Sequence, residues 1–125
     1  MSKKIIHTND APKAIGPYSQ AVEINGFLYI SGQIPVNPAT GNIPEGIEAQ
    51  TEQVMKNIEA ILKEAGYIFS DVIKSTCLLS DIANFKAMNE VYAKYYTSEC
   101  PARAAFAVRD LPLGVLVEIE TIAAK

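Results

Sequence analysis

The first third of the chain carries the pattern of a β-hairpin. Two apolar runs, 21–24 and 27–30, flank the dipeptide Asn25-Gly26. Asparagine and glycine adopt the positive φ angles that a two-residue hairpin turn needs, so we predict two antiparallel strands joined at this point. The preceding residues, 5–20, contain two prolines and a glycine and predict a loop.

The rest of the chain alternates between helical and extended patterns. Apolar residues recur at helical spacing over 47–65 and again over 83–97, which predicts two amphipathic helices. Gly66 lies where a left-handed residue would end the first helix, and Pro101 prevents a helix from continuing past the second. Short apolar runs bounded by polar turn residues predict three more strands, at 72–79, 104–108 and 115–123.

These elements predict an α+β fold in the order β-β-α-β-α-β-β, with a single mixed β-sheet and both helices on one face. A length of 125 residues suits a single domain spanning 1–125. The last strand is apolar on both sides, with Val117 and Ile119 on one and Leu116 and Ile122 on the other. Because two helices cover one face only, the open face would expose an apolar patch, and self-association is the simplest way to bury it.

Composition excludes several classes of function. The net charge is −3 and no cluster of basic residues stands out, so we expect no nucleic-acid partner. The apolar runs are too short to cross a bilayer, and no apolar segment follows the N-terminal residues, so we expect neither a membrane anchor nor a signal peptide. Two cysteines and one histidine give neither a disulfide framework nor a metal site. We therefore expect a protein of the reducing cytoplasm.

Arg103 is the first candidate for chemistry. It follows Pro101-Ala102 and precedes the apolar segment 104–106. A charge in apolar surroundings costs several kcal/mol unless it is paired, so the residue either forms an ion pair or receives an anion. The planar donors of arginine fit both oxygens of a carboxylate. The residues alone leave both roles open, and the ion pair is the commoner one.

Glu118 and Glu120 form the second candidate. They lie two apart on a predicted strand and so point to the same side, together with Leu116 and Ile122. Two interpretations stay open at this point. The glutamates belong to a solvated edge strand, or one carboxylate sits in a partly buried pocket where it can handle a proton or a water.

Other polar residues have ordinary structural explanations. Tyr18 is by default a packing aromatic, Ser31 a hydroxyl at a strand end, and Asn89 a donor or acceptor between helix and loop. Nucleophilic catalysis has few candidates, because Cys77 lies in an apolar strand and Cys100 has no histidine near it in sequence.

Five motifs taken together resemble the RidA/YjgF-type reactive imine deaminases from end to end. The resemblance implies an α+β fold similar to that of the small trimeric chorismate mutases. It also implies a homotrimer with its sites in the clefts between subunits, which agrees with the open apolar face. The motifs are Gly16-Pro17-Tyr18-Ser19-Gln20, Ser31-Gly32-Gln33-Ile34-Pro35, Phe85 to Asn89, Pro101-Ala102-Arg103 and Val117-Glu118-Ile119-Glu120.

The resemblance also implies roles for individual residues. Arg103 would grip the substrate carboxylate, and Glu118 would hold and activate water. Many members carry Ser-Cys after the arginine, where this chain has Ala104-Ala105. This departure removes any role for a thiol there and leaves imine hydrolysis intact. The residues that would line the substrate pocket are Tyr18, Ser31, Gly32 and Asn89.

The implied reaction is the hydrolysis of 2-iminobutanoate and 2-iminopropanoate to 2-oxo acids and ammonia, without metal or cofactor. Pyridoxal-phosphate-dependent dehydratases, which release such imino acids, would be functional partners. One alternative is a non-catalytic trimer that binds small 2-oxo acids as a regulator. A second, an RNA-cleaving protein, is disfavoured by the negative net charge and the single histidine. A chorismate-mutase-like rearrangement rests on fold analogy alone.

Overall fold

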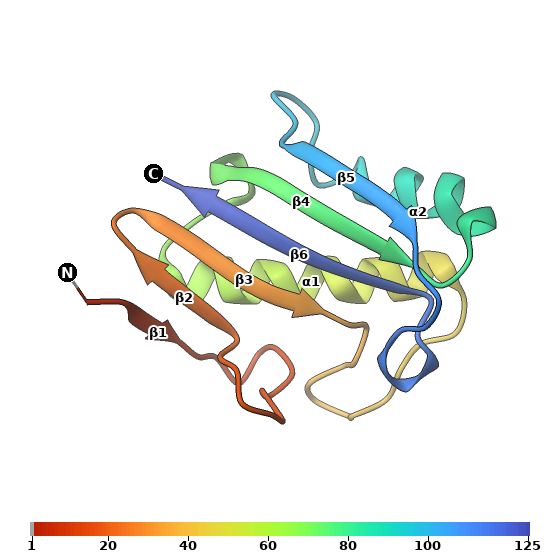
Figure 1. Ribbon diagram of the computed structural model, residues 1–125, viewed down its shortest axis with the longest axis horizontal. Coiled ribbons are helices and arrows are strands. Elements are labelled where there is room, and N and C mark those ends of the chain that lie inside the picture. The colour runs from red at the N-terminus through yellow and green to blue at the C-terminus, as the bar shows by residue number, and fades with distance from the viewer. Residues whose placement is uncertain (1) are drawn as a thin grey trace.

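A six-stranded sheet with two helices on one face forms the molecule, as Figure 1 shows. The computed structural model describes residues 2–125. The strands run in the order β1-β2-β3-β6-β4-β5. Among the described residues β4 and β5 are the only parallel neighbours, so the sheet is mixed as predicted. The elements are β1 (Lys4–Ile6), β2 (Ala21–Ile24), β3 (Phe27–Gln33), α1 (Ile47–Ala65), β4 (Val72–Leu79), α2 (Phe85–Tyr92), β5 (Ala102–Ala107) and β6 (Val117–Ala124).

The predicted hairpin turn and the predicted first helix are both confirmed. Asn25 and Gly26 both take positive φ angles, of 53° and 84°, in the turn between β2 and β3. The helix α1 spans the predicted residues, and Gly66 ends it in the left-handed conformation. No helix among residues 2–125 is both long enough and apolar enough to cross a membrane.

Several predicted boundaries were wrong, and one strand was not predicted. The strand β1 lies inside the predicted loop and has only three residues, too few to show an alternating pattern. The second helix is shorter than predicted, because a 3₁₀ turn at 82–84 precedes α2 and the chain leaves the helix after Tyr92 while Tyr96 still packs in the core. The strand β5 begins at Ala102, two residues earlier than expected, and β6 begins at Val117, two residues later than expected. The element order therefore gains one strand at the N-terminus.

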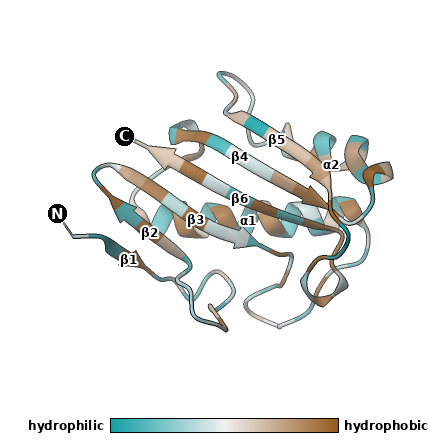
Figure 2. Ribbon diagram, in the orientation of Figure 1, coloured by the Kyte–Doolittle hydropathy of each residue, from teal (hydrophilic) through white to brown (hydrophobic). Residues whose placement is uncertain are grey.

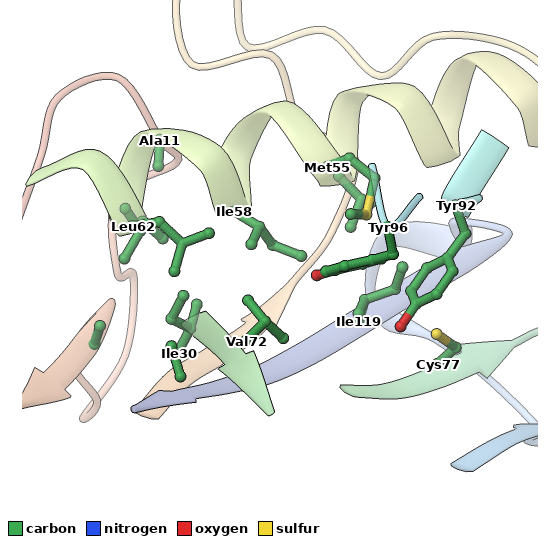
Figure 3. Packing of buried hydrophobic residues seen from close by; sticks show 14 of the residues in the cluster. Ala11, Ile30, Met55, Ile58, Leu62, Val72, Cys77, Tyr92, Tyr96 and Ile119 are labelled. Atoms are coloured by element: carbon green, nitrogen blue, oxygen red, sulfur yellow. The ribbon is translucent and has the colours of Figure 1, made fainter. Parts of the chain in front are cut away.

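The core lies between α1 and the sheet. Each fully buried leucine, isoleucine or valine there contributes about 1.5–3 kcal/mol to the free energy of unfolding. Figure 3 shows side chains of α1 pointing at side chains of the sheet. The residues that meet are Met55, Ile58 and Leu62 from the helix and Ile30, Val72 and Ile119 from the strands.

No helix of residues 2–125 lies over the opposite face of the sheet. Hydrophobic segments recur along the central strands in Figure 2, and four large apolar side chains of β3, β4 and β5 are more than a third exposed: Phe27, Tyr29, Ile73 and Phe106. The predicted open apolar face is therefore present in the single chain. Burying such a patch is a strong driving force for association.

Candidate functional site

Arg103 and Glu118 lie on opposite faces of the sheet. In the register of β4, Arg103 is the neighbour of Ser75, whose side chain is fully buried under the helices. Glu118 is instead the neighbour of Leu78, which lies three residues after Ser75 in β4 and therefore an odd number of positions away. Neighbours in a sheet share a face and successive residues alternate, so the arginine faces the helices and the glutamate faces the open side.

The Arg103 guanidinium is held by one face of α2. Its Nη1 donates a hydrogen bond of 2.5 Å to Oδ1 of Asn89. Its central carbon lies 5.5 Å from the ring centroid of Phe85 and 5.0 Å from that of Tyr92, both within the range of a cation–π interaction. Phe85, Asn89 and Tyr92 follow one another at spacings of four and three, which places them on one side of a helix. Asn89 thus serves the arginine rather than a helix–loop bond.

Arg103 has no carboxylate partner in the described part of the chain. Within residues 2–125, the one salt bridge joins Arg109 and Asp110, both on the surface. Asn89 is neutral, so the charge of Arg103 stays uncompensated, and most of the five N–H donors of its guanidinium are free to bind another acceptor. The ion-pair role, which the sequence alone favoured, is therefore wrong for the single chain. The anion-receptor role fits the geometry.

Glu118 lies in a cavity of about 580 Å³ on the open side. Tyr18, Ser31, Gly32 and Glu120 line the same cavity, so the structure brings these predicted residues together. The hydroxyl of Ser31 donates a 2.6 Å hydrogen bond to the backbone carbonyl of Ser19. This bond ties β3 to the loop that carries Tyr18, so Ser31 has a structural role at the cavity wall.

Gly32 leaves the space that the Glu118 carboxylate occupies. A Cβ atom at position 32 would lie 2.0 Å from Oε2 of Glu118, far inside contact distance. The register between β3 and β6 shifts between Ile30 and Gln33, so the strand is irregular around this residue. Such irregularities occur next to active sites because they redirect a strand locally. Glycine at this position is therefore a requirement of the carboxylate's placement.

The Glu118 carboxyl group is less acidic than an ordinary glutamate. Burial raises its pKa, and the negative charge of Glu120 on the same side of β6 raises it further. The positive charge of Arg103 does not lower this pKa in the single chain, because Arg103 lies across the sheet from Glu118.

The raised pKa predicts how stability depends on pH. A carboxyl group whose pKa is raised on folding favours the protonated folded state, so the free energy of unfolding falls as pH rises from its ordinary pKa through its folded one. We expect Glu118→Gln to raise the melting temperature at neutral pH, because it removes the destabilising contribution that Glu118 makes as pH rises above its ordinary pKa of 4.5. Glu120→Gln should produce a smaller change in the same direction. Thermal unfolding as a function of pH checks this, and a Glu118→Gln protein that melts at or below the wild-type temperature at pH 7 would contradict it.

The cysteines offer no reactive thiol for this site. Burial raises the pKa of Cys77 to about 11, with the charge of Arg103 opposing the change, so its thiol stays protonated near neutral pH. Cys100 is exposed and donates to the carbonyl of Tyr96. In the described part of the chain, no group of three histidine, cysteine, aspartate or glutamate side chains is arranged to hold a metal ion.

The sequence did not indicate several of the residues that surround Arg103 and Glu118. Phe85 and Tyr92 contact Arg103, and helical spacing from Asn89 could have indicated them. Apolar residues complete the cavity around Glu118, and they carried no signal because nothing local ties them to a glutamate: Ile15, Ile34, Pro112 and Leu113. A larger hollow of about 720 Å³ lies against α1 and includes none of the predicted site residues.

Comparison with known proteins places these residues in a family. The family model described as Endoribonuclease L-PSP matches residues 8–125. A Lactococcus lactis protein named as a regulator, AldR, is 58% identical over 96% of each chain. The 2-iminobutanoate/2-iminopropanoate deaminase of Mus musculus is 48% identical over 97% of this chain and 90% of its own. A structure described as E. coli TdcF with bound serine matches with a TM-score of 0.94 at 41% identity, over 98% of both chains.

The chain is a small α+β protein with a carboxylate cavity on one face of its sheet and an uncompensated guanidinium on the other. It belongs to the Endoribonuclease L-PSP family, also called the YjgF/RidA family. The resemblance identified from the five motifs is confirmed, and so is the fold class that it implied.

Proposed function

We propose that this protein hydrolyses 2-imino acids and their enamine tautomers, such as 2-iminobutanoate and 2-iminopropanoate, to 2-oxo acids and ammonia. The observation that carries the proposal is the uncompensated Arg103 guanidinium, held in place by Asn89, Phe85 and Tyr92. A fixed planar cation suits a substrate with a carboxylate. The deaminase of Mus musculus supports the reaction type.

The active site is completed by a second copy of the chain. Because Arg103 and Glu118 lie on opposite faces of one sheet, a small substrate cannot touch both within a single protomer. The open apolar face supplies the surface for association. We propose a homotrimer in which Arg103 of one protomer faces the Glu118 cavity of the next, which gives three sites at the seams between protomers.

The reaction then follows from the two groups. Arg103 binds the carboxylate and orients the imine carbon over the cavity. Glu118 takes a proton from a water molecule as the oxygen of that water attacks the imine carbon, and the proton then passes to the imine nitrogen. Glu118 then transfers the hydroxyl proton of the tetrahedral adduct to nitrogen as the carbon–nitrogen bond breaks, so ammonia leaves and the 2-oxo acid remains. In the single chain, burial and the charge of Glu120 raise the pKa of Glu118, which makes it a stronger base than an ordinary glutamate.

The bound serine named for the E. coli structure supports a small amino-acid-like ligand for this fold. Serine has a carboxylate, a central carbon and a nitrogen in the same sequence as a 2-imino acid. A site in this chain that accepts such a molecule would need one cation for the carboxylate and space for the nitrogen. The links to pyridoxal-phosphate-dependent dehydratases and to the cytoplasm stay predictions.

The test measures ammonia release from 2-iminobutanoate that a threonine dehydratase generates in the same vessel. We expect Glu118→Gln to lower the rate about a hundredfold, the low end of general-base catalysis. We also expect it to bind 2-oxobutanoate about as tightly as the wild type, because Arg103 is intact. The name of the Lactococcus lactis relative favours the alternative, a regulator that binds 2-oxo acids without chemistry. Wild-type protein that binds 2-oxobutanoate but leaves the release rate unchanged would establish that alternative.

A further inference from the structure

Leu113 has two features that are unfavourable in the single chain. Its backbone is left-handed, with φ 57° and ψ 18°, a conformation that residues other than glycine and asparagine rarely adopt. Its side chain is 71% exposed, so packing within the chain does not offset the strain. Backbone strain that packing does not explain is concentrated at functional sites. The leucine side chain therefore has a role outside the fold of the protomer.

The side chain of Leu113 lines the cavity that holds Glu118. Ile15, which is 87% exposed, lines it from the N-terminal loop, and both residues also line a smaller adjoining hollow of about 240 Å³. The two segments are far apart in sequence, yet both present an exposed apolar side chain to the same cavity. Ile34 and Pro112 extend the apolar wall.

We propose that Leu113 and Ile15 form a subsite for the apolar side chain of the substrate and make the enzyme prefer 2-imino acids with larger alkyl side chains. The inference rests on the proposed function. A 2-imino acid has three substituents on its reacting carbon. The carboxylate is bound by Arg103 and the nitrogen leaves as ammonia, so the side chain is directed to the remaining wall of the cavity, which is apolar. Burial of an alkyl group against this wall favours longer substrates.

The test compares two substrates generated in the same vessel by an amino-acid oxidase with catalase, 2-iminopropanoate and 2-imino-4-methylpentanoate. We expect Leu113→Ala to lower kcat/KM about tenfold for the larger substrate and less than about twofold for the smaller one. Leu113→Gly removes the same side chain while it suits the left-handed backbone. It should lose the same discrimination between the two substrates and melt at a higher temperature than Leu113→Ala. The comparison separates the effect of the missing side chain from the effect of the backbone strain.

Ile68→Ala is the matched control, since Ile68 is 63% exposed and lines the separate hollow against α1. It should leave both substrates unaffected. Equal losses on both substrates in Leu113→Ala, or a change of its oligomeric state by light scattering, would show that Leu113 packs against the next protomer and would overturn the inference. An unchanged substrate ratio in both Leu113 variants would overturn it too. A wild-type protein without turnover on either substrate overturns the proposed function and this inference with it.

Discussion

Arg103→Ala is expected to lower kcat/KM for 2-iminobutanoate about a thousandfold. Two charge-assisted hydrogen bonds to a carboxylate are worth roughly 1.5–3 kcal/mol each, which corresponds to a factor of this size. Arg103→Lys should lose about a hundredfold, because a point charge does not reproduce the planar pair of donors. Ammonia release measures both, and Arg109→Ala is the control, since Arg109 is fully on the surface in its pair with Asp110. Equal rates for wild type and Arg103→Ala would exclude the proposed function.

Mixed trimers test where the two groups come from. Arg103→Ala and Glu118→Gln are each expected to be nearly inactive. When they are coexpressed with different tags and purified on both, every trimer contains both variants. One of its three seams then joins an intact Arg103 to an intact Glu118 of the neighbour, so about one third of wild-type activity should return. No recovery would mean that both residues act within one protomer, which contradicts the placement on opposite faces.

The sequence correctly predicted the structural features that depend on the conformational preferences of one or two neighbouring residues. The Asn25-Gly26 turn and the Gly66 cap depend on φ angles that few residue types adopt, and the structure has them where predicted. The strand β1 was missed because it exists only through pairing with β2, and its three residues carry no pattern of their own. The end of α2 was also missed, because Tyr96 is apolar and buried whether or not the backbone there is helical.

The same distinction applies to the site. The cost of burying a charge was enough to pick out Arg103 and Glu118 from the sequence. Whether they face each other depends on the register of β5 and β6 against β4, which is set by tertiary packing and not by either segment. For this reason the sequence could not decide between ion pair and anion receptor, nor predict the direction in which the pKa of Glu118 moves. The register places Arg103 and Glu118 on opposite faces, which explains both why they form no ion pair within one chain and why Arg103 does not lower the pKa of Glu118.

Gly32→Ala is the second change with a large expected effect. The φ angle at Gly32 is not positive, so alanine causes no backbone strain there, and the conflict is with the Glu118 side chain alone. Its Oε2, Cδ and Cγ atoms would lie 2.0, 3.0 and 3.3 Å from the added Cβ. The carboxylate must rotate away, and we expect kcat/KM to fall by about a hundredfold or more, as it does when a general base is lost. The melting temperature should change by only a few degrees, about the effect of a surface rearrangement.

A double-mutant cycle shows whether the loss acts through Glu118. If Gly32→Ala only displaces the carboxylate, adding it to Glu118→Gln should cost much less than it costs the wild type, because the group it displaces is already inactive. Independent losses that multiply would instead mean that alanine blocks the substrate itself, with Gly32 serving as a contact for the ligand. Binding of 2-oxobutanoate separates the two directly. Displacement of Glu118 should leave affinity close to wild type, since Arg103 is unchanged, whereas a blocked cavity should weaken it in proportion to the lost rate.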